Sequence, residues 1–202
     1  MSKGGSPWIA VIKHIDLEFK NDSYIKKKDY SNKLAPLSGS EPKYEPKKWN
    51  KGRVKDNHNC YAYALNKLAY GRTDKSQPGY FTNFPPLRET DYSCATFETR
   101  MKKDNPGLYI TDYNSKCKPN MHKGFLAIAT GEDFDYHFYR QDKNGYWSHK
   151  PGRTDARNTD SSNKKIINPL LADRKSSSFD YNHPCFFFCV NSKLSSLSSS
   201  SN

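Results

Sequence analysis

The spacing of apolar residues changes once along this chain, and that change constrains the fold more than any other feature. Before Gly107, apolar residues recur at helical spacing in two segments, 60–68 (CYAYALNKL) and 91–103. After Gly107 they alternate with polar residues, as in strands. Helical segments followed by strands predict an α+β fold, with an N-terminal helix packed on an antiparallel sheet.

Each expected helix is preceded by residues that can cap it: Asn57 or Asn59 for the first, and Thr90 or Asp91 for the second. Three of the expected strands are joined by short turns, which favours antiparallel pairing. A further alternating segment, 8–19, predicts a short strand without an evident partner. The four principal strands are expected at 124–130 (GFLAIAT), 134–141 (FDYHFYRQ), 146–150 (YWSHK) and 185–190 (CFFFCV).

A chain of 202 residues is long enough for one core of ordinary size. Hydrophobic residues make up only 34% of it, but aromatic residues reach 14%, which indicates a folded protein with an aromatic core. We expect three parts: a basic, proline-punctuated arm at 1–55, a folded domain at 56–191, and a serine-rich tail at 192–202 that is disordered.

The net charge of +12 favours an anionic partner. Residues 1–55 contain 13 Lys and Arg against 6 Asp and Glu, so +7 of that charge lies in the arm. The arm is therefore expected to dock on a larger assembly such as a virion. Nucleic-acid binding is possible but without sequence specificity, because no recognition motif is present.

The location of the protein is expected to be cytoplasmic or virion-associated. Lys13 and His14 interrupt the first apolar run, which argues against a signal peptide. No apolar run approaches the roughly 20 residues that span a bilayer, so no membrane partner is expected.

The chain has five cysteines, and the odd number predicts at least one free thiol. Cys185 and Cys189 lie near His183 and suggest a metal site, but a second ligand pair cannot be placed from the sequence. Cysteines buried in the core are the better interpretation, and we expect no metal and no cofactor.

Cys60 begins the first expected helix, where free N–H groups and the helix dipole stabilise a thiolate. A nucleophilic thiolate needs an imidazole base, and His137 lies on a following strand between two aromatic residues. An inert buried cysteine and a half-buried histidine are the alternative interpretation. We expect Cys60 to be a nucleophile and His137 to be its base.

The third member of this site depends on a hairpin. If 143–145 (KNG) forms a three-residue turn with a left-handed glycine, Tyr139 faces His149. His137 then lies diagonal to His149 on one face of the sheet and can be oriented by it. A slip of one residue would put the two histidines on opposite faces. Three polar residues after the hairpin compete for this role: Asp155, Asn158 and Asp160.

A cysteine at a helix start, a histidine on a strand and a second polar residue one hairpin later resemble NlpC-type and CHAP-type amidases of the papain-like superfamily. The resemblance covers roughly 57–150 and implies thiol chemistry with the residue order Cys, His, His. The chain departs from these amidases in lacking their usual Asp-Cys-Ser or Gly-Gln-Cys start.

A more specific resemblance is to a poorly characterised family of bacteria and large DNA viruses. It implies homology without an established substrate, and it extends over 59–191. It is carried by four blocks, NCYAYALN (59–66), TDKSQPG (73–79), DYHFYRQDKNGYWSHKPG (135–152) and IINPLLADR (166–174).

These features together predict a cysteine peptidase or amidase that cleaves a peptide or isopeptide bond through an acyl-enzyme. Cys60 would attack the carbonyl carbon, His137 would transfer the proton, and His149 would orient the ring. Its partner would be a peptide or protein substrate. The rival interpretation is a non-enzymatic protein of a virion or another assembly, docked through its basic arm.

Overall fold

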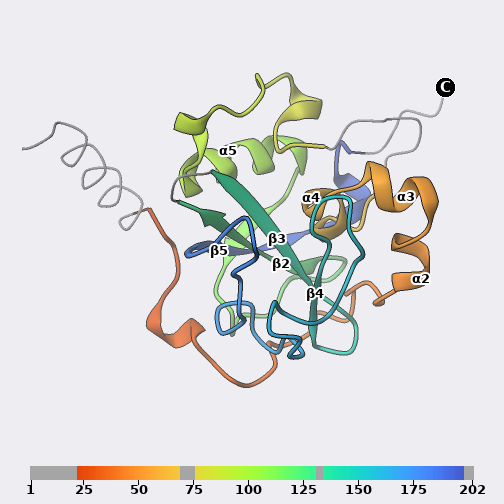
Figure 1. Ribbon diagram of the computed structural model, residues 1–202. Coiled ribbons are helices and arrows are strands. Elements are labelled where there is room, and N and C mark those ends of the chain that lie inside the picture. The colour runs from red at the N-terminus through yellow and green to blue at the C-terminus, as the bar shows by residue number, and fades with distance from the viewer. Residues whose placement is uncertain (1–21, 69–75, 131–133, 198–202) are drawn as a thin grey trace, which may run out of the picture.

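The computed structural model describes residues 22–68, 76–130 and 134–197. It confirms an α+β fold with a five-stranded antiparallel sheet in the order β1-β5-β2-β3-β4 (Figure 1). The strands are β1 (Tyr109–Thr111), β2 (His122–Ala129), β3 (Asp135–Gln141), β4 (Trp147–His149) and β5 (His183–Val190). The α-helices are α2 (Pro46–Trp49), α3 (Gly52–Asn57), α4 (Cys60–Ala64) and α5 (Cys94–Asp104). Four 3₁₀ turns complete the elements, η1 (Lys27–Asp29), η2 (Tyr80–Thr82), η3 (Glu89–Asp91) and η4 (Ser192–Leu194).

The first expected helix is present as α4, but it is shorter than the sequence predicted. The Asn59 side chain accepts a hydrogen bond from the backbone N–H of Ala62, which confirms one of the two expected caps. The helix ends because Asn66 adopts a left-handed backbone with φ of 53°, and the Lys67 N–H then bonds back to the Ala62 carbonyl. The expected continuation to residue 68 is therefore wrong.

The second expected helix, α5, begins at Cys94 rather than at residue 91. Its cap is Ser93, whose hydroxyl accepts a hydrogen bond from the Thr96 N–H at 3.1 Å. Asp91 instead caps the short turn η3, where its carboxylate accepts the N–H of Arg88. The sequence predicted Thr90 or Asp91 as the cap of α5, and that prediction is wrong.

The hairpin between β3 and β4 has the predicted register. Gly145 has φ of 87°, the left-handed conformation that this turn requires, and the Asp142 N–H bonds to the Tyr146 carbonyl. Tyr139 consequently pairs with His149 across the two strands. The four predicted strands lie within two residues of their expected bounds, whereas β1 was missed because three residues show no clear alternation.

The sheet has an apolar layer on each face. Alternate residues of each strand, such as Phe138 and Phe188, face α4 and α5 in one core. The intervening residues, such as Phe125 and Phe187, contact the loops on the other face. The aromatic core that the composition predicted is therefore two layers separated by the sheet.

The segment 22–55 is packed on the domain rather than extended as a free arm. The Tyr24 N–H bonds to the Cys185 carbonyl at 2.8 Å, and Asp29 is buried with its carboxylate bonded to the Tyr113 N–H. Trp49 is fully buried against Tyr63. Lysine content suggested a leader, but apolar residues between the lysines, such as Ala35 and Trp49, are buried in the domain. The strand expected at 8–19 lies outside the described residues.

The serine-rich tail is not disordered from its first residue. The Ser196 N–H bonds to the Asp104 carbonyl at 2.7 Å, and Leu197 is completely buried in the core beside α5. One apolar residue thus anchors this segment despite its serine-rich composition.

Two disulfides connect β5 to the rest of the molecule. Cys94–Cys185 joins it to the start of α5, and Cys117–Cys189 joins it to the loop before β2. Cys185 and Cys189 are fully buried, as expected of core cysteines, and the structure adds that each forms a disulfide. Cys60 is the remaining free thiol, which confirms the inference from the odd cysteine count.

A buried ion pair holds α4 against the sheet. Arg140 of β3 is fully buried, and it donates to the Asp142 carboxylate at 3.0 Å and to the Tyr63 carbonyl at 3.2 Å. Its guanidinium also bonds to the side chain of Asn66, the residue that ends α4.

In the described part of the chain, no helix is long and apolar enough to cross a bilayer.

We expect Arg140→Met to lower the free energy of unfolding by about 3–5 kcal/mol, because it leaves the Asp142 carboxylate buried without its partner. Urea unfolding followed by circular dichroism measures the change. Arg153→Met removes an exposed arginine and should cost under about 0.5 kcal/mol. Equal effects of the two substitutions would contradict the role given to the ion pair.

Replacing Cys117 and Cys189 together by serine should lower the unfolding free energy by about 2–5 kcal/mol, because the disulfide closes a long loop. The two cysteines are 72 residues apart. Calorimetry of the oxidised double variant measures the loss, and adding a reductant should destabilise the wild type further than the variant. A melting temperature unchanged by both treatments would show that the bond contributes nothing.

A candidate binding cleft beside the first core helix

A cleft of about 780 Å³ opens where the start of α4 meets β3 and β4. Its floor includes Cys60, His137 and His149, so the structure brings the three predicted site residues to one cavity. Two loop segments, 151–161 and 174–181, form its walls. The remaining lining residues include Asn59, Gln77, Tyr92, Asp135, Tyr136 and Tyr139.

Cys60 occupies the helix start as predicted, but its thiol is not ionised. Burial raises its pKa to about 12, and the negative charge of Asp135 adds to the shift. A one-turn helix offers a small dipole, which does not offset the loss of water around a thiolate. The sulfur lies 3.8 Å from the Tyr136 carbonyl, its hydrogen-bond acceptor.

The two histidines form the predicted pair. His137 Nε2 lies 2.7 Å from His149 Nδ1, and His149 Nε2 lies 2.9 Å from the Thr159 carbonyl. Because a carbonyl only accepts, His149 carries its proton on Nε2, and His137 Nε2–H donates to His149 Nδ1. Burial lowers the pKa of His149 to about 4. Burial also lowers the pKa of His137 well below its usual range, and the charge of a protonated His149 would lower it further. Both rings are therefore neutral at pH 7.

The competitors for the third position serve elsewhere. Asp155 is exposed and pairs with Lys55 at 3.4 Å. The carboxylate of Asp160 accepts backbone N–H groups of its own loop, including that of Lys164. Asn158 accepts the Ile166 N–H through its backbone carbonyl. Of the four candidates, His149 is the one in hydrogen-bond contact with His137.

Among the described residues, the hydrogen-bond partner of the Cys60 thiol is the Tyr136 carbonyl rather than the expected base, His137. Tyr136 and Phe138 share the helix-side core with Cys60, and neighbouring strand residues point to opposite faces. His137 therefore packs on the other face, against Tyr139 and Tyr181 with ring centroids 4.9 and 5.1 Å away. The catalytic roles assigned to these residues stay predictions.

Sequence reasoning missed the charged walls of the cleft. Arg157, Arg174 and Lys175 line it. In the part of the chain that the structure describes, the acid among the lining residues is Asp135, which accepts a hydrogen bond from the Tyr181 hydroxyl at 2.7 Å. Arg174 is the last residue of the segment IINPLLADR (166–174). No local sequence pattern indicated that this segment leads into a loop beside His137 and His149.

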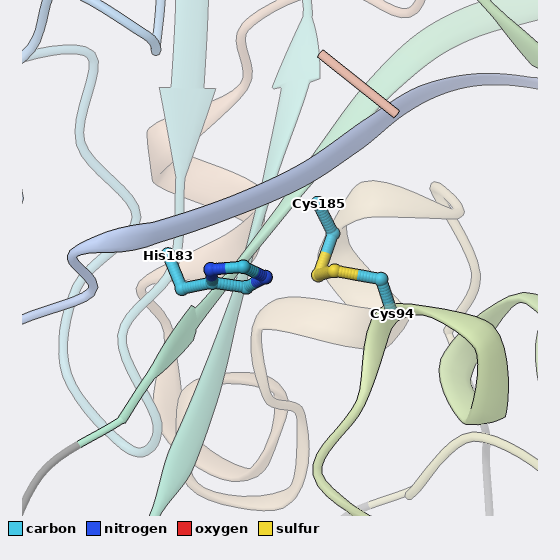
Figure 2. Close-up of side chains that lie close together, drawn as sticks. All are labelled: Cys94, His183 and Cys185. Atoms are coloured by element: carbon cyan, nitrogen blue, oxygen red, sulfur yellow. A yellow bond between two sulfur atoms is a disulfide. The ribbon is translucent and has the colours of Figure 1, made fainter. Parts of the chain in front are cut away.

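One cluster has the spacing of metal ligands: Cys94, His183 and Cys185 lie within 4.8 Å of one another (Figure 2). The two sulfur atoms are bonded to each other, so neither is a thiolate that can bind a metal. His183 Nε2 also lies 3.1 Å from the Asp22 carboxylate. The structure therefore assigns this cluster to a disulfide with a histidine beside it.

The fold and cleft define a disulfide-bonded α+β protein with neutral groups on the cleft floor and cations on its walls. The chain is 36% identical over 132 residues to insoluble matrix shell protein 1 of Ruditapes philippinarum, a match that covers 65% of this chain and 81% of the relative. The chain belongs to the same family as that shell protein. No family model and no solved structure matches it.

This relationship overturns the functional expectation. A cysteine peptidase or amidase was expected, and the relative is a shell matrix protein. The expectation of a viral or virion-associated assembly protein is wrong on the same ground. A cytoplasmic or virion location is also wrong, since the relative belongs to a shell matrix and two disulfides are typical of an oxidising, extracellular environment.

We expect iodoacetamide to alkylate Cys60 at pH 7 at least about a hundredfold more slowly than a free thiol, because its raised pKa leaves little thiolate. The rate should keep rising with pH beyond 10, as the neutral form is the favoured one. Mass spectrometry of the non-reduced protein measures the rate, and the same chain unfolded in urea is the control. A rate that levels off below pH 9 would contradict the assignment.

Proposed function

We propose that this protein is a secreted structural component of an insoluble extracellular matrix. The observation that carries the proposal is its identity of 36% to a shell matrix protein across 81% of that protein. Similarity over most of the relative favours a shared role in an assembly, because the whole folded unit is retained.

The covalent structure supports this role. Two disulfides tie β5 to α5 and to the loop before β2, and such bonds persist in oxidising extracellular surroundings. They also stabilise the fold, because each cross-link restricts the unfolded chain. The buried, neutral thiol of Cys60 fits a structural role as well, since burial raises its pKa to about 12.

The charge of the protein supplies a means of retention. A net charge of +12 attracts anionic macromolecules, and exposed lysines of 22–55 such as Lys27, Lys43 and Lys47 contribute to it. We propose that this packed segment presents its lysines to a larger anionic assembly.

We also propose that the scaffold is of the papain-like type, related to the poorly characterised family named above. Support comes from the order of its parts: Cys60 at a helix start, His137 on a strand and His149 one hairpin later. This proposal concerns ancestry and layout alone.

An antibody against the chain should detect it in the part of the source's extracellular matrix that neutral buffer does not dissolve. Denaturant with reductant should release it. A tagged Cys60→Ala chain expressed in matrix-secreting cells should enter the insoluble fraction as the wild type does, because the proposed role depends on the fold and not on the thiol. Recovery of the wild-type chain only from the soluble cell extract would contradict the proposal.

A further inference from the structure

We infer that the cleft beside α4 binds an anionic oligosaccharide, one whose sugar rings carry carboxylate or sulfate groups. As a means of attachment to a matrix this inference rests on the proposed function, whereas the binding itself follows from the cleft. The charge, the aromatic rings and the covered backbone of the cleft each point to this class of ligand.

The first observation is the imbalance of charge. Arg157 and Lys175 are exposed, line the cleft, and have side chains that make no hydrogen bond or ion pair with another described residue. Arg174 stands beside them, with its Nε and Nη1 bonded to backbone carbonyls such as that of Tyr181. Among the described lining residues Asp135 is the acid, and it already accepts a hydrogen bond from the Tyr181 hydroxyl. Guanidinium and ammonium groups in this setting bind carboxylate or sulfate oxygens.

The floor adds no charge that opposes or neutralises an anion. His137 and His149 are neutral because burial lowers the pKa of both. Cys60 is neutral because burial raises its pKa. The electrostatic attraction for a ligand therefore comes from the walls, while the floor offers polar and aromatic contacts.

The second observation is a ladder of rings that runs from the floor to the rim. Tyr181 packs against His137 with ring centroids 5.1 Å apart and planes tilted by 31°, and Phe179 packs against Tyr181 with ring centroids 6.0 Å apart and the same tilt. Phe179 and Tyr181 remain partly exposed in the cleft. Such ring faces pack against the apolar C–H faces of sugars, whereas a small inorganic anion gains nothing from them.

The rim carries hydroxyl groups where a sugar would need them. The segment 174–181 is a hairpin in which Lys175 pairs with Asp180 and the Ser176 N–H bonds to the Phe179 carbonyl. Its turn holds Ser177 and Ser178, both exposed and both lining the cleft. A few placed polar groups around aromatic surface are what gives a small-molecule cleft its specificity.

The third observation disfavours an extended peptide as the ligand. A peptide strand adds to a sheet through unpaired backbone groups at an edge. The outer edge of β4 is covered, because Trp147 pairs with Ile166 and His149 pairs with Arg157 in both directions. The cleft thus offers side chains rather than a free sheet edge.

Isothermal titration of the purified full-length chain tests the inference in about 0.15 M salt. The probes are a chondroitin sulfate tetrasaccharide, a hyaluronan tetrasaccharide, neutral chitotetraose and a hexa-aspartate peptide. We expect at least one anionic sugar to bind about tenfold or more tightly than chitotetraose and than the peptide. The two anionic probes separate sulfate from carboxylate recognition.

Arg157→Gln with Lys175→Gln should weaken binding by about tenfold or more. Lys103→Gln with Lys116→Gln is the matched control, since it removes the same charge from exposed lysines that neither line the cleft nor belong to the segment 22–55. It should change the affinity by less than about twofold, if contact rather than net charge decides. Phe179→Ala should also weaken binding without any change in charge. NMR shifts in the wild-type chain should centre on the cleft walls, which tests the site without a variant.

Equal loss in the cleft and control variants would overturn the inference in favour of diffuse surface attraction. Binding of hexa-aspartate as tight as that of either sugar, and unaffected by Phe179→Ala, would overturn it in favour of an acidic peptide. No binding of either anionic sugar, by a chain found in the insoluble matrix, would refute the cleft inference and leave the proposed function standing. Sugar binding at the cleft by a chain absent from that matrix would support the cleft inference and contradict the proposed function.

Discussion

The packing of α4 on the sheet depends on the ion pair and hydrogen bonds made by the buried guanidinium of Arg140. A fully buried charge is stable only where its hydrogen bonds are made, and here they are made by Asp142 and by the last turn of α4. The His122 ring, which lies 2.8 Å from the Ala64 carbonyl, holds the same end of the helix. A one-turn helix is unstable by itself, so these contacts from β3 and β2 are what place Cys60 at the cleft.

Burial also sets the chemistry of the cleft. Cysteine and histidine side chains exchange protons readily where water surrounds them. Here Cys60 is a neutral thiol and His137 and His149 are neutral imidazoles, because their charged forms would be poorly solvated in the buried floor of the cleft. Charge is confined to the walls, on side chains that water still reaches. This division suits the recognition of an anion better than the activation of a nucleophile, and it agrees with kinship to a shell matrix protein.

Local parts of the structure were predictable, and distant contacts were not. The pairing of Tyr139 with His149 followed from the length of one turn with a left-handed glycine, and the structure has it. The cap of α5 was misplaced because Ser93 competes with two neighbours that are equally good caps in sequence. The packed state of 22–55 was missed because burial of Trp49 requires a surface formed by residues far along the chain.

The sequence by itself determined the α+β layout, the hairpin register and the presence of an unpaired cysteine, since periodicity, turn length and an odd count are local or arithmetical properties. Only the tertiary structure decided that Cys94 joins Cys185, that Cys60 and His137 reach the cleft from different faces of β3, and that Arg157 lines the same cleft as both histidines. Those outcomes depend on how a sheet, a short helix and two loops pack together, and packing energies between distant residues leave no pattern in a single chain.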